Sequence, residues 1–282
     1  MALWFAALLG VVQGLTEFIP ISSSAHLRIL PAVLGIEDPG AAYTAVIQLG
    51  TLVAVLVYFA KDLIALPGAM LQRDLSTPAG RLPWLLAAAT VPIVVVGLLL
   101  KKQIEGDLRS LYVIVIAMIS VGIAMAVIDR IASGRGSRPL DAITLSDAVL
   151  VGLAQTLAVV PGVSRSGATI CMALLLGFSR SDSARFSFLL SIPAIAGAGI
   201  FELRTAIVGS SAVPALGRLA VPALGREAIP ALLVGTGTAF VVGYFSIAWF
   251  IKWLGSHDLL GFAIYRVVAG LALLAALLRG AI

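Results

Sequence analysis

The stretch that decides the fold is residues 145–178, which read LSDAVLVGLAQTLAVVPGVSRSGATICMALLLGF. Apolar residues fill both ends of this stretch, but Pro161, Gly162 and the Ser-Arg-Ser triplet at 164–166 interrupt its middle. Each apolar half is shorter than the roughly 20 residues that a helix needs to cross a bilayer. A helix broken at membrane depth is tolerated only where the freed backbone lines a cavity or is covered by protein. The pattern predicts a re-entrant hairpin, in which two short helices enter the membrane and return to the same side.

Residues 2–35 have the same construction. Two apolar halves surround Glu17, Pro20, three serines at 22–24 and His26. A glycine, a glutamine and a proline occur in the same order in both stretches, and serines follow the proline in each. We therefore predict another re-entrant hairpin at the start of the chain.

The composition supports a membrane location. Of the 282 residues, 60% are hydrophobic and only 12% are charged, and the mean hydropathy is +1.09. Globular domains carry about 25% charged residues, so the composition excludes a soluble enzyme, a nucleic-acid-binding domain and a disordered chain. The isoelectric point near 9.7 indicates Lys and Arg at lipid headgroups, and we expect the lipid bilayer and no nucleic acid as a partner. A single cysteine and two histidines exclude an internal disulfide and a Cys- or His-rich metal site.

Other apolar runs are long enough to cross the bilayer as continuous helices. They lie at about 41–60, 84–100, 111–129, 186–203, 231–251 and 259–278. These six transmembrane helices and the two re-entrant helical hairpins predict an all-α polytopic membrane protein, with residues 1–282 forming a single membrane domain. Lys and Arg divide almost equally between the two faces of this topology, so the positive-inside rule does not orient it.

Three spans follow each hairpin. A hairpin that returns to its own side followed by three spans crosses the membrane an odd number of times. A following copy therefore begins on the opposite side and must be inverted relative to the first. We predict an inverted repeat, with residues 1–130 (hairpin about 2–35) as the first copy and residues 145–282 (hairpin about 145–178) as the second. Binding sites in such proteins lie where the broken segments meet. Val-Pro-Ala-Leu-Gly-Arg occurs twice in the connection 205–229, which we interpret as a tolerated loop expansion.

The first hairpin carries an acid where acids are costly. An ionised carboxylate at membrane depth is by default a functional-site hypothesis, and Glu17 lies on the same helix face as Gln13, four residues earlier. The alternative is that this hairpin lies shallow in the interface and Glu17 faces water. The serines at 22–24 are typical of a helix N-terminus, where backbone N–H groups favour an anion. His26 titrates near neutral pH and is a candidate proton carrier.

The second hairpin carries a complementary set of groups. Arg165 lies among Ser164, Ser166, Gly167 and Thr169. The guanidinium fork suits two-point contact with phosphate, and glycine lets the backbone approach a ligand closely. The alternative is a structural arginine whose head group reaches back to the interface. If the two hairpins meet, their contents suit phosphate-ester chemistry.

One more charge falls inside a predicted span. Arg266 lies in the last apolar run. We expect it to be buried with an ion-pair partner that the sequence does not identify.

The two motifs resemble those of the bacterial undecaprenyl-pyrophosphate phosphatase family, also called bacitracin-resistance proteins. The stretch from Gln13 to His26, QGLTEFIPISSSAH, is similar to the family's (E/Q)xxxE motif and the serines that follow it. The stretch 161–169, PGVSRSGAT, is similar to its PGxSRSxxT motif. Both occur in the expected order, and the resemblance extends over essentially the whole chain. Two positions depart from the common pattern: Gln13 replaces a glutamate, which makes a two-carboxylate metal site less favourable, and Ala25 stands where glycine is common.

The resemblance implies an activity. Family members hydrolyse undecaprenyl diphosphate to undecaprenyl phosphate and phosphate, which recycles the lipid carrier for peptidoglycan and cell-wall synthesis and confers resistance to bacitracin. It also implies the inverted-repeat fold, a polyprenyl diphosphate lipid as substrate, a place in the bacterial plasma (inner) membrane, and an active site facing the periplasm or cell exterior. A divalent cation, Mg²⁺ or Ca²⁺, is the expected cofactor. The oligomeric state stays open, with a homodimer among the alternatives.

The candidate site residues follow from the motifs and the resemblance together. The expected catalytic residues are Glu17, Ser23, His26 and Arg165, with Glu17 also a candidate metal ligand. The expected substrate-binding residues are Gln13, Ser22, Ser24, Ser164, Ser166, Gly167 and Thr169. The nucleophile is either Ser23 or a bound water. The alternative function is an inverted-repeat transporter or flippase for a polyprenyl phosphate or another anionic lipid, because such proteins share broken helices and a midplane site.

Overall fold

The computed structural model describes residues 1–72, 75–100, 103–104, 106–133, 137–208 and 226–282. Within these ranges the regular structure is helical, apart from one isolated β-bridge between Arg138 and Phe178. The all-α prediction is confirmed. Most of the repeated sequence in the 205–229 connection lies outside the described residues. In chain order the helices are α1 (Leu3–Thr16), α2 (Ser23–Leu34), α3 (Gly40–Tyr58), α4 (Ala60–Gln72), α5 (Pro78–Leu99), η1 (Asp107–Arg109), α7 (Leu111–Ala132), η2 (Leu140–Ala142), α8 (Leu145–Gln155), η3 (Thr156–Val159), α9 (Arg165–Leu175), α10 (Arg180–Val208), η5 (Arg226–Ala228), α11 (Ile229–Leu254) and α12 (Leu260–Leu278).

The described chain contains five single helices that are long and apolar enough to cross a membrane, namely α5, α7, α10, α11 and α12. A sixth candidate span is the pair α3 and α4, which is bent by 74° between Tyr58 and Ala60. These elements coincide with the six predicted spans and confirm a multi-pass membrane protein. Between the first two predicted spans the chain continues after the bend as α4, which ends at Gln72. The polar residues Lys61 and Asp62 mark the bend rather than a loop.

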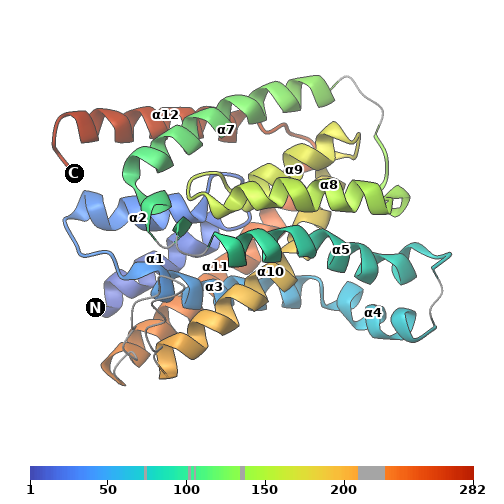
Figure 1. Cartoon of the computed structure of the whole chain (residues 1–282), viewed down its shortest axis with the longest axis horizontal. Helices are drawn as coiled ribbons and strands as arrows, with labels where there is room; N and C mark the ends of the chain where they lie inside the picture. The colour runs from blue at the N-terminus through green and yellow to red at the C-terminus, as the bar shows by residue number, and fades with distance from the viewer. Residues whose placement is uncertain (73–74, 101–102, 105, 134–136, 209–225) are drawn as a thin grey trace.

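Each predicted hairpin is a pair of short helices around an irregular break. The first pair is α1 and α2, and the second is α8 and α9 with the short helix η3 between them. Figure 1 shows the two pairs entering from opposite ends: α1 and α2 lie towards the left of the molecule, and α8 and α9 lie to the right. An inverted repeat would produce this opposed arrangement. The division into residues 1–130 and 145–282 stays a prediction.

The backbone geometry of the two breaks matches closely. Ser22 precedes α2 with φ 77° and ψ 96°, and Ser164 precedes α9 with φ 75° and ψ 116°. They are the two non-glycine residues with positive φ in the described chain. Left-handed conformations are costly for residues with a Cβ atom and persist where the surroundings impose them, often at functional sites. The fold therefore imposes the same strained turn at both breaks.

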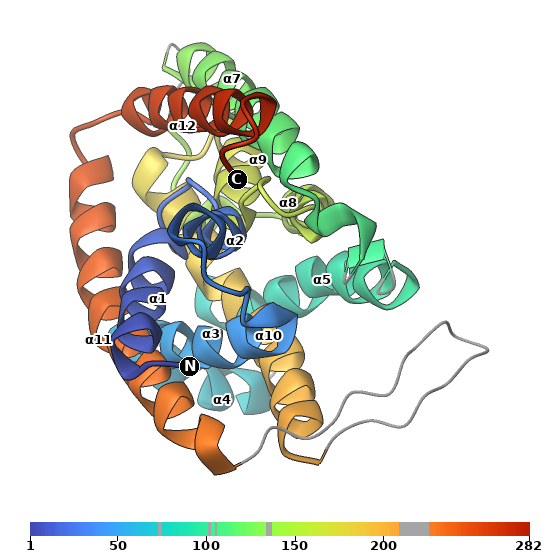
Figure 2. The ribbon, with the colours of Figure 1, turned by 90° about the vertical axis from the view of Figure 1, so that its left-hand side faces the viewer.

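Glycines bring each hairpin close to a neighbouring span. A Cβ atom at Gly10 would collide with the carbonyl oxygen of Gly235 in α11, and one at Gly152 would collide with the carbonyl oxygen of Ala89 in α5. Small residues of this kind allow the close helix packing found in membranes. Helix α11 packs against both α1 and α3, and α12 packs against α7, as Figure 2 shows at its left and upper edges. The two hairpins are thus held by different spans and meet in the interior.

Candidate active site

The two breaks lie against each other. The hydroxyl of Ser166 donates to the carbonyl oxygen of Ile19 at 3.3 Å. The backbone N–H of Gly162 donates to the hydroxyl oxygen of Ser24 at 3.4 Å. Residues from the two sequence motifs, more than a hundred positions apart, therefore form a single site.

Glu17 is at the centre of this site and is only 4% exposed. Its Oε2 accepts hydrogen bonds from Gln13 Nε2 at 2.8 Å and from the Ser23 hydroxyl at 2.7 Å. Its Oε1 accepts from Gln48 Nε2 and from Arg165 Nη2, both at 2.8 Å. The interpretation of Glu17 as a water-facing residue in a shallow hairpin is wrong. Four donors stabilise the buried carboxylate and offset the cost of removing it from water.

Sequence reasoning missed two residues of this cluster, Gln48 and Thr51. Gln48 donates to Glu17, and Thr51 Oγ1 accepts from Gln13 Nε2 at 3.3 Å. A signal was present, because Thr44, Gln48 and Thr51 recur every three or four residues along one face of an otherwise apolar span. That polar stripe faces the first hairpin, so the site is formed by the two hairpins and by α3.

Arg165 is the first residue of α9 and is largely buried, with 14% of its side chain exposed. Its pairing with Glu17 excludes the interpretation of an arginine that reaches back to the interface. One guanidinium nitrogen, Nη1, is buried and meets no hydrogen-bond acceptor in the described chain. A buried unsatisfied donor costs about 1–3 kcal/mol. Oxygen atoms of a bound phosphate would satisfy this donor.

The serines of the second break form a compact hydroxyl network. Ser164 Oγ accepts from the backbone N–H of Gly167 at 3.1 Å and lies 3.1 Å from Ser166 Oγ. A Cβ atom at Gly167 would lie 3.3 Å from the Ser164 side chain, so the glycine keeps this contact open. Thr169 is placed differently, because its hydroxyl bonds to the Arg165 carbonyl at 2.8 Å and lies 2.6 Å from Ser187 Oγ. Thr169 thus ties α9 to α10 beneath the site.

His26 lies beside the cluster without touching its acid. Its Nδ1 lies 2.7 Å from the carbonyl oxygen of Ser22, which requires a proton on Nδ1. Its Nε2 lies 2.6 Å from the hydroxyl of Tyr265, whose ring stacks on the imidazole with centroids 5.7 Å apart. Within the described chain His26 therefore supports the break that carries Ser22 and Ser23, and it bonds to neither Glu17 nor Ser23.

Arg266 joins both breaks from α12. It is fully buried, and its Nη1 donates to the Pro20 carbonyl at 3.1 Å. Its Nη2 donates to the carbonyls of Gly162 at 2.6 Å and Ala117 at 3.3 Å. The expectation of an ion-pair partner is wrong, because in the described chain this guanidinium binds three backbone carbonyl oxygens and no carboxylate. The arginine is therefore a cationic bridge between the breaks.

The described residues do not by themselves form a metal site. They contain no close group of three His, Cys, Asp or Glu side chains. Glu17 is the one acid of the cluster, and four donors already occupy its two oxygens. Mg²⁺ is commonly held by one or two carboxylates together with substrate phosphates. A cation at this site would need most of its ligands from a bound phosphate.

The strained turn at Ser22 gives a stability prediction. Glycine adopts positive φ without the Cβ penalty of about 1–2 kcal/mol, so Ser22→Gly should be more stable than Ser22→Ala. At Ser120, inside α7, the order should reverse, because glycine in a helix interior costs about 1 kcal/mol relative to alanine. Thermal unfolding of the four purified variants in one detergent measures both differences. If the glycine and alanine variants have the same order of thermal stability at both positions, the backbone at Ser22 is not strained.

Comparisons with known proteins identify the family to which the chain belongs. The family model described as "Bacitracin resistance protein BacA" matches residues 6–272. A protein named undecaprenyl-diphosphatase from Prosthecochloris aestuarii is 44% identical over 99% of both chains. Proteins of the same name from Chlorobium phaeovibrioides and a Nocardioides species are 45% and 44% identical, over 99% and 98% of this chain and 99% and 97% of their own. The chain belongs to the family of the bacitracin resistance protein BacA.

Proposed function

We propose that this membrane protein is an undecaprenyl-diphosphatase, which hydrolyses undecaprenyl diphosphate to undecaprenyl phosphate and phosphate. The observation that carries the proposal is the cluster in which Glu17 bonds to both the Ser23 hydroxyl and Arg165. A hydroxyl beside a carboxylate and an arginine with a spare donor are the parts that phosphoryl transfer needs. The names of the relatives favour this hydrolysis over a transporter or flippase.

The proposed reaction starts with the polyprenyl chain in lipid and the diphosphate between the hairpins. Arg165 binds oxygens of the terminal phosphate, first through the unsatisfied Nη1. Ser23 Oγ attacks the terminal phosphorus while Glu17 Oε2, 2.7 Å away, accepts the hydroxyl proton. The phosphorus–oxygen bond of the anhydride breaks, and undecaprenyl phosphate leaves with the bonding electrons. Water then hydrolyses the phosphoserine and releases phosphate, restoring Ser23.

The surrounding polar groups hold this arrangement in place. Gln13 and Gln48 fix the carboxylate from two helices, so Glu17 presents one oxygen to Ser23 and the other to Arg165. Ser22, Ser24, Ser164, Ser166 and Gly167 line the breaks and place hydroxyl or N–H groups near the phosphate. His26 keeps the first break in position through the Ser22 carbonyl. Donors fixed in advance need no reorganisation as charge builds on the phosphoryl group.

We also propose that the protein lies in the bacterial plasma membrane, with the site opening to the periplasm or cell exterior; the family to which the chain belongs supports this proposal. There it would return the lipid carrier to peptidoglycan synthesis and confer bacitracin resistance. We also propose that Mg²⁺ or Ca²⁺ supports the reaction: the substrate diphosphate would supply most of its ligands, beside Glu17, and the cation would offset the charge of the phosphates. The single, fully bonded carboxylate of the site supports this over a metal held by the protein alone.

The role of Arg165 gives the main functional prediction. Arg165→Ala removes the donor that meets the phosphate, and Glu17→Gln removes the proton acceptor. Each should lower phosphate release from undecaprenyl diphosphate by about a hundredfold or more, the usual loss for such groups. Release is measured in detergent, with Arg185→Ala, a surface arginine paired with Asp62, as the matched control. Near-normal hydrolysis by Arg165→Ala would refute the assignment.

The identity of the nucleophile is tested separately. With substrate labelled in its terminal phosphate, rapid acid quench of the wild type should leave label on the protein, because phosphoserine is stable to acid. Ser23→Ala should lose both the label and turnover. Phosphate release at close to the wild-type rate by Ser23→Ala, with solvent oxygen in the product, would instead identify water as the nucleophile.

The cation proposal predicts a specific response to chelation. A chelator should stop phosphate release, and added Mg²⁺ or Ca²⁺ should restore it, because the cation binds with the diphosphate. The thermal unfolding temperature of the substrate-free protein should not change, since the described residues contain no set of metal ligands. Undiminished turnover in chelator would contradict the cation, and a large loss of thermal stability would indicate a metal held by the protein.

A further inference from the structure

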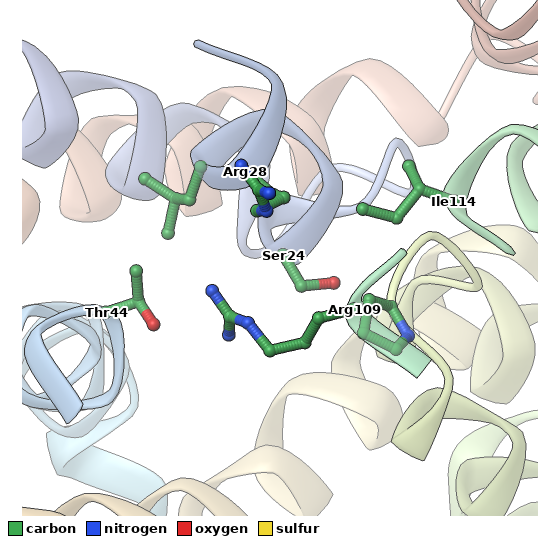
Figure 3. A pocket seen from close by; sticks show the side chains of 7 residues that line it. Ser24, Arg28, Thr44, Arg109 and Ile114 are labelled. Carbon is green, nitrogen blue, oxygen red and sulfur yellow. The ribbon is translucent and has the colours of Figure 1, made fainter. Parts of the chain in front are cut away.

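A small cavity lies next to the catalytic cluster. It has a volume of about 40 Å³, and its lining combines Ser24, Arg28, Thr44 and Arg109 with the apolar residues Leu27, Ile114 and Pro161. We call it the mouth pocket. Figure 3 shows the side chain of Arg109 extending towards Thr44, with Ser24 and Arg28 above it. One water needs about 10–15 Å³ of cavity volume, so the pocket has room for roughly three waters or a group of similar size.

The mouth pocket shares its walls with the catalytic site. Ser24 follows the proposed nucleophile Ser23 and accepts from the second break through Gly162 N–H. Pro161 belongs to the second break itself. Thr44 is one helical turn before Gln48, which donates to Glu17. A ligand in the pocket would therefore lie directly beside the reacting group.

The pocket carries an excess of positive charge. Arg28 Nε and Arg109 Nη2 approach the same oxygen, Asp38 Oδ2, at 3.4 and 3.0 Å. The other oxygen, Oδ1, accepts from the backbone N–H of Gly40 at 3.0 Å. Two guanidinium groups thus share one carboxylate, which leaves a net charge of +1. Asp38 is their one acidic partner in the described chain, so most of the five donors on each arginine stay available.

The catalytic cluster alone does not balance the charge of a diphosphate. Glu17 and Arg165 cancel each other, and Arg266 is buried behind the carbonyls it binds. A diphosphate brings several negative charges into this low-dielectric site, where uncompensated charge is costly. Arg28 and Arg109 are only partly buried, with 30% and 25% of their side chains exposed. They can therefore meet an incoming anion at a smaller desolvation cost.

We propose that the mouth pocket is a second phosphate subsite, formed by Arg28, Arg109 and Ser24. The proposal rests on the proposed function and deepens it, since the subsite would act next to the reacting phosphate. Its ligand is a phosphate group with one of two sources: the phosphate of the substrate that is not attacked, or the inorganic phosphate released by hydrolysis. Arginine forks suit the oxygens of either. Asp38 orients the guanidinium groups of Arg28 and Arg109 and offsets part of their charge. Phosphate is therefore bound weakly enough to leave.

The test uses the full-length protein purified in detergent. The variants are Arg28→Gln, Arg109→Gln and Asp38→Asn; the last removes the charge but keeps the oxygen that accepts from Gly40. Arg185→Gln is the matched control, because it breaks a similar arginine–aspartate pair, with Asp62, between α4 and α10. Two quantities are measured: equilibrium binding of radiolabelled inorganic phosphate, which needs no turnover, and KM and kcat with undecaprenyl diphosphate.

The subsite predicts changes of opposite sign. Loss of one charged hydrogen-bonding group should weaken phosphate binding or raise KM roughly tenfold in Arg28→Gln and Arg109→Gln. Asp38→Asn should change the same quantity in the opposite direction, an effect that misfolding cannot imitate. A change in KM alone assigns the pocket to the substrate's second phosphate, and a change in phosphate affinity alone assigns it to the product.

The contrary outcome is equally specific. If the three variants match Arg185→Gln in both phosphate affinity and KM, the subsite does not exist. If the two arginine variants weaken phosphate binding or raise KM but Asp38→Asn does not change the same quantity in the opposite direction, the contact of Arg28 and Arg109 with Asp38 is only structural. That result would also overturn the proposal. Failure of the proposed function is distinguishable, because the wild type would then release no phosphate from the lipid, while phosphate binding could still be measured.

Discussion

The structure depends on one buried charge, the guanidinium of Arg266. In the described chain it binds backbone carbonyls of Pro20, Gly162 and Ala117, and no carboxylate. A carbonyl inside a continuous helix is already bonded to an N–H group four residues on, so a spare acceptor at this depth exists chiefly where a helix is broken. The arginine and the two breaks therefore require each other. Without the breaks the guanidinium would keep only the carbonyl of Ala117, inside α7, and without the charge the freed carbonyls of Pro20 and Gly162 would lack this donor.

This mutual requirement explains the geometry of the site. Because α12 binds both breaks through one rigid fork, the segments carrying Ser22 and Ser164 are held at a fixed separation. Each then turns into its second helix through a left-handed residue. The turn points the first residues of α2 and α9 at each other, which places Ser23 and Arg165 on the two oxygens of Glu17. The strained turns at Ser22 and Ser164 are thus required for the N-termini of α2 and α9 to meet at the site.

The sequence predicted the parts of this arrangement that have a local signature. Polar residues and prolines inside apolar stretches revealed both breaks, and the complementary charges of Glu17 and Arg165 indicated that they would meet. Gln48 was detectable from its spacing to Thr44 and Thr51, but the sequence does not show which way a span is rotated. The partners of Arg266 had no signature at all, because a backbone carbonyl is present at every residue and only the fold decides which ones are free.

The saturation of Glu17 constrains how the site can work. Arg165, through Nη2, and the hydroxyl of Ser23 both bond to one carboxylate, so the charges of Glu17 and Arg165 cancel. A phosphate that binds the unpaired Nη1 of Arg165 would also compete with Glu17 for Nη2 and draw the guanidinium towards its own oxygens. In the proposed mechanism this exchange would free Oε1 of Glu17 while Oε2 accepts the proton of Ser23, and it would favour the transition state, in which phosphate charge is greatest. In the proposed mechanism the ion pair between Glu17 and Arg165 is therefore the contact that phosphate binding would loosen, and the substrate itself would prepare the base.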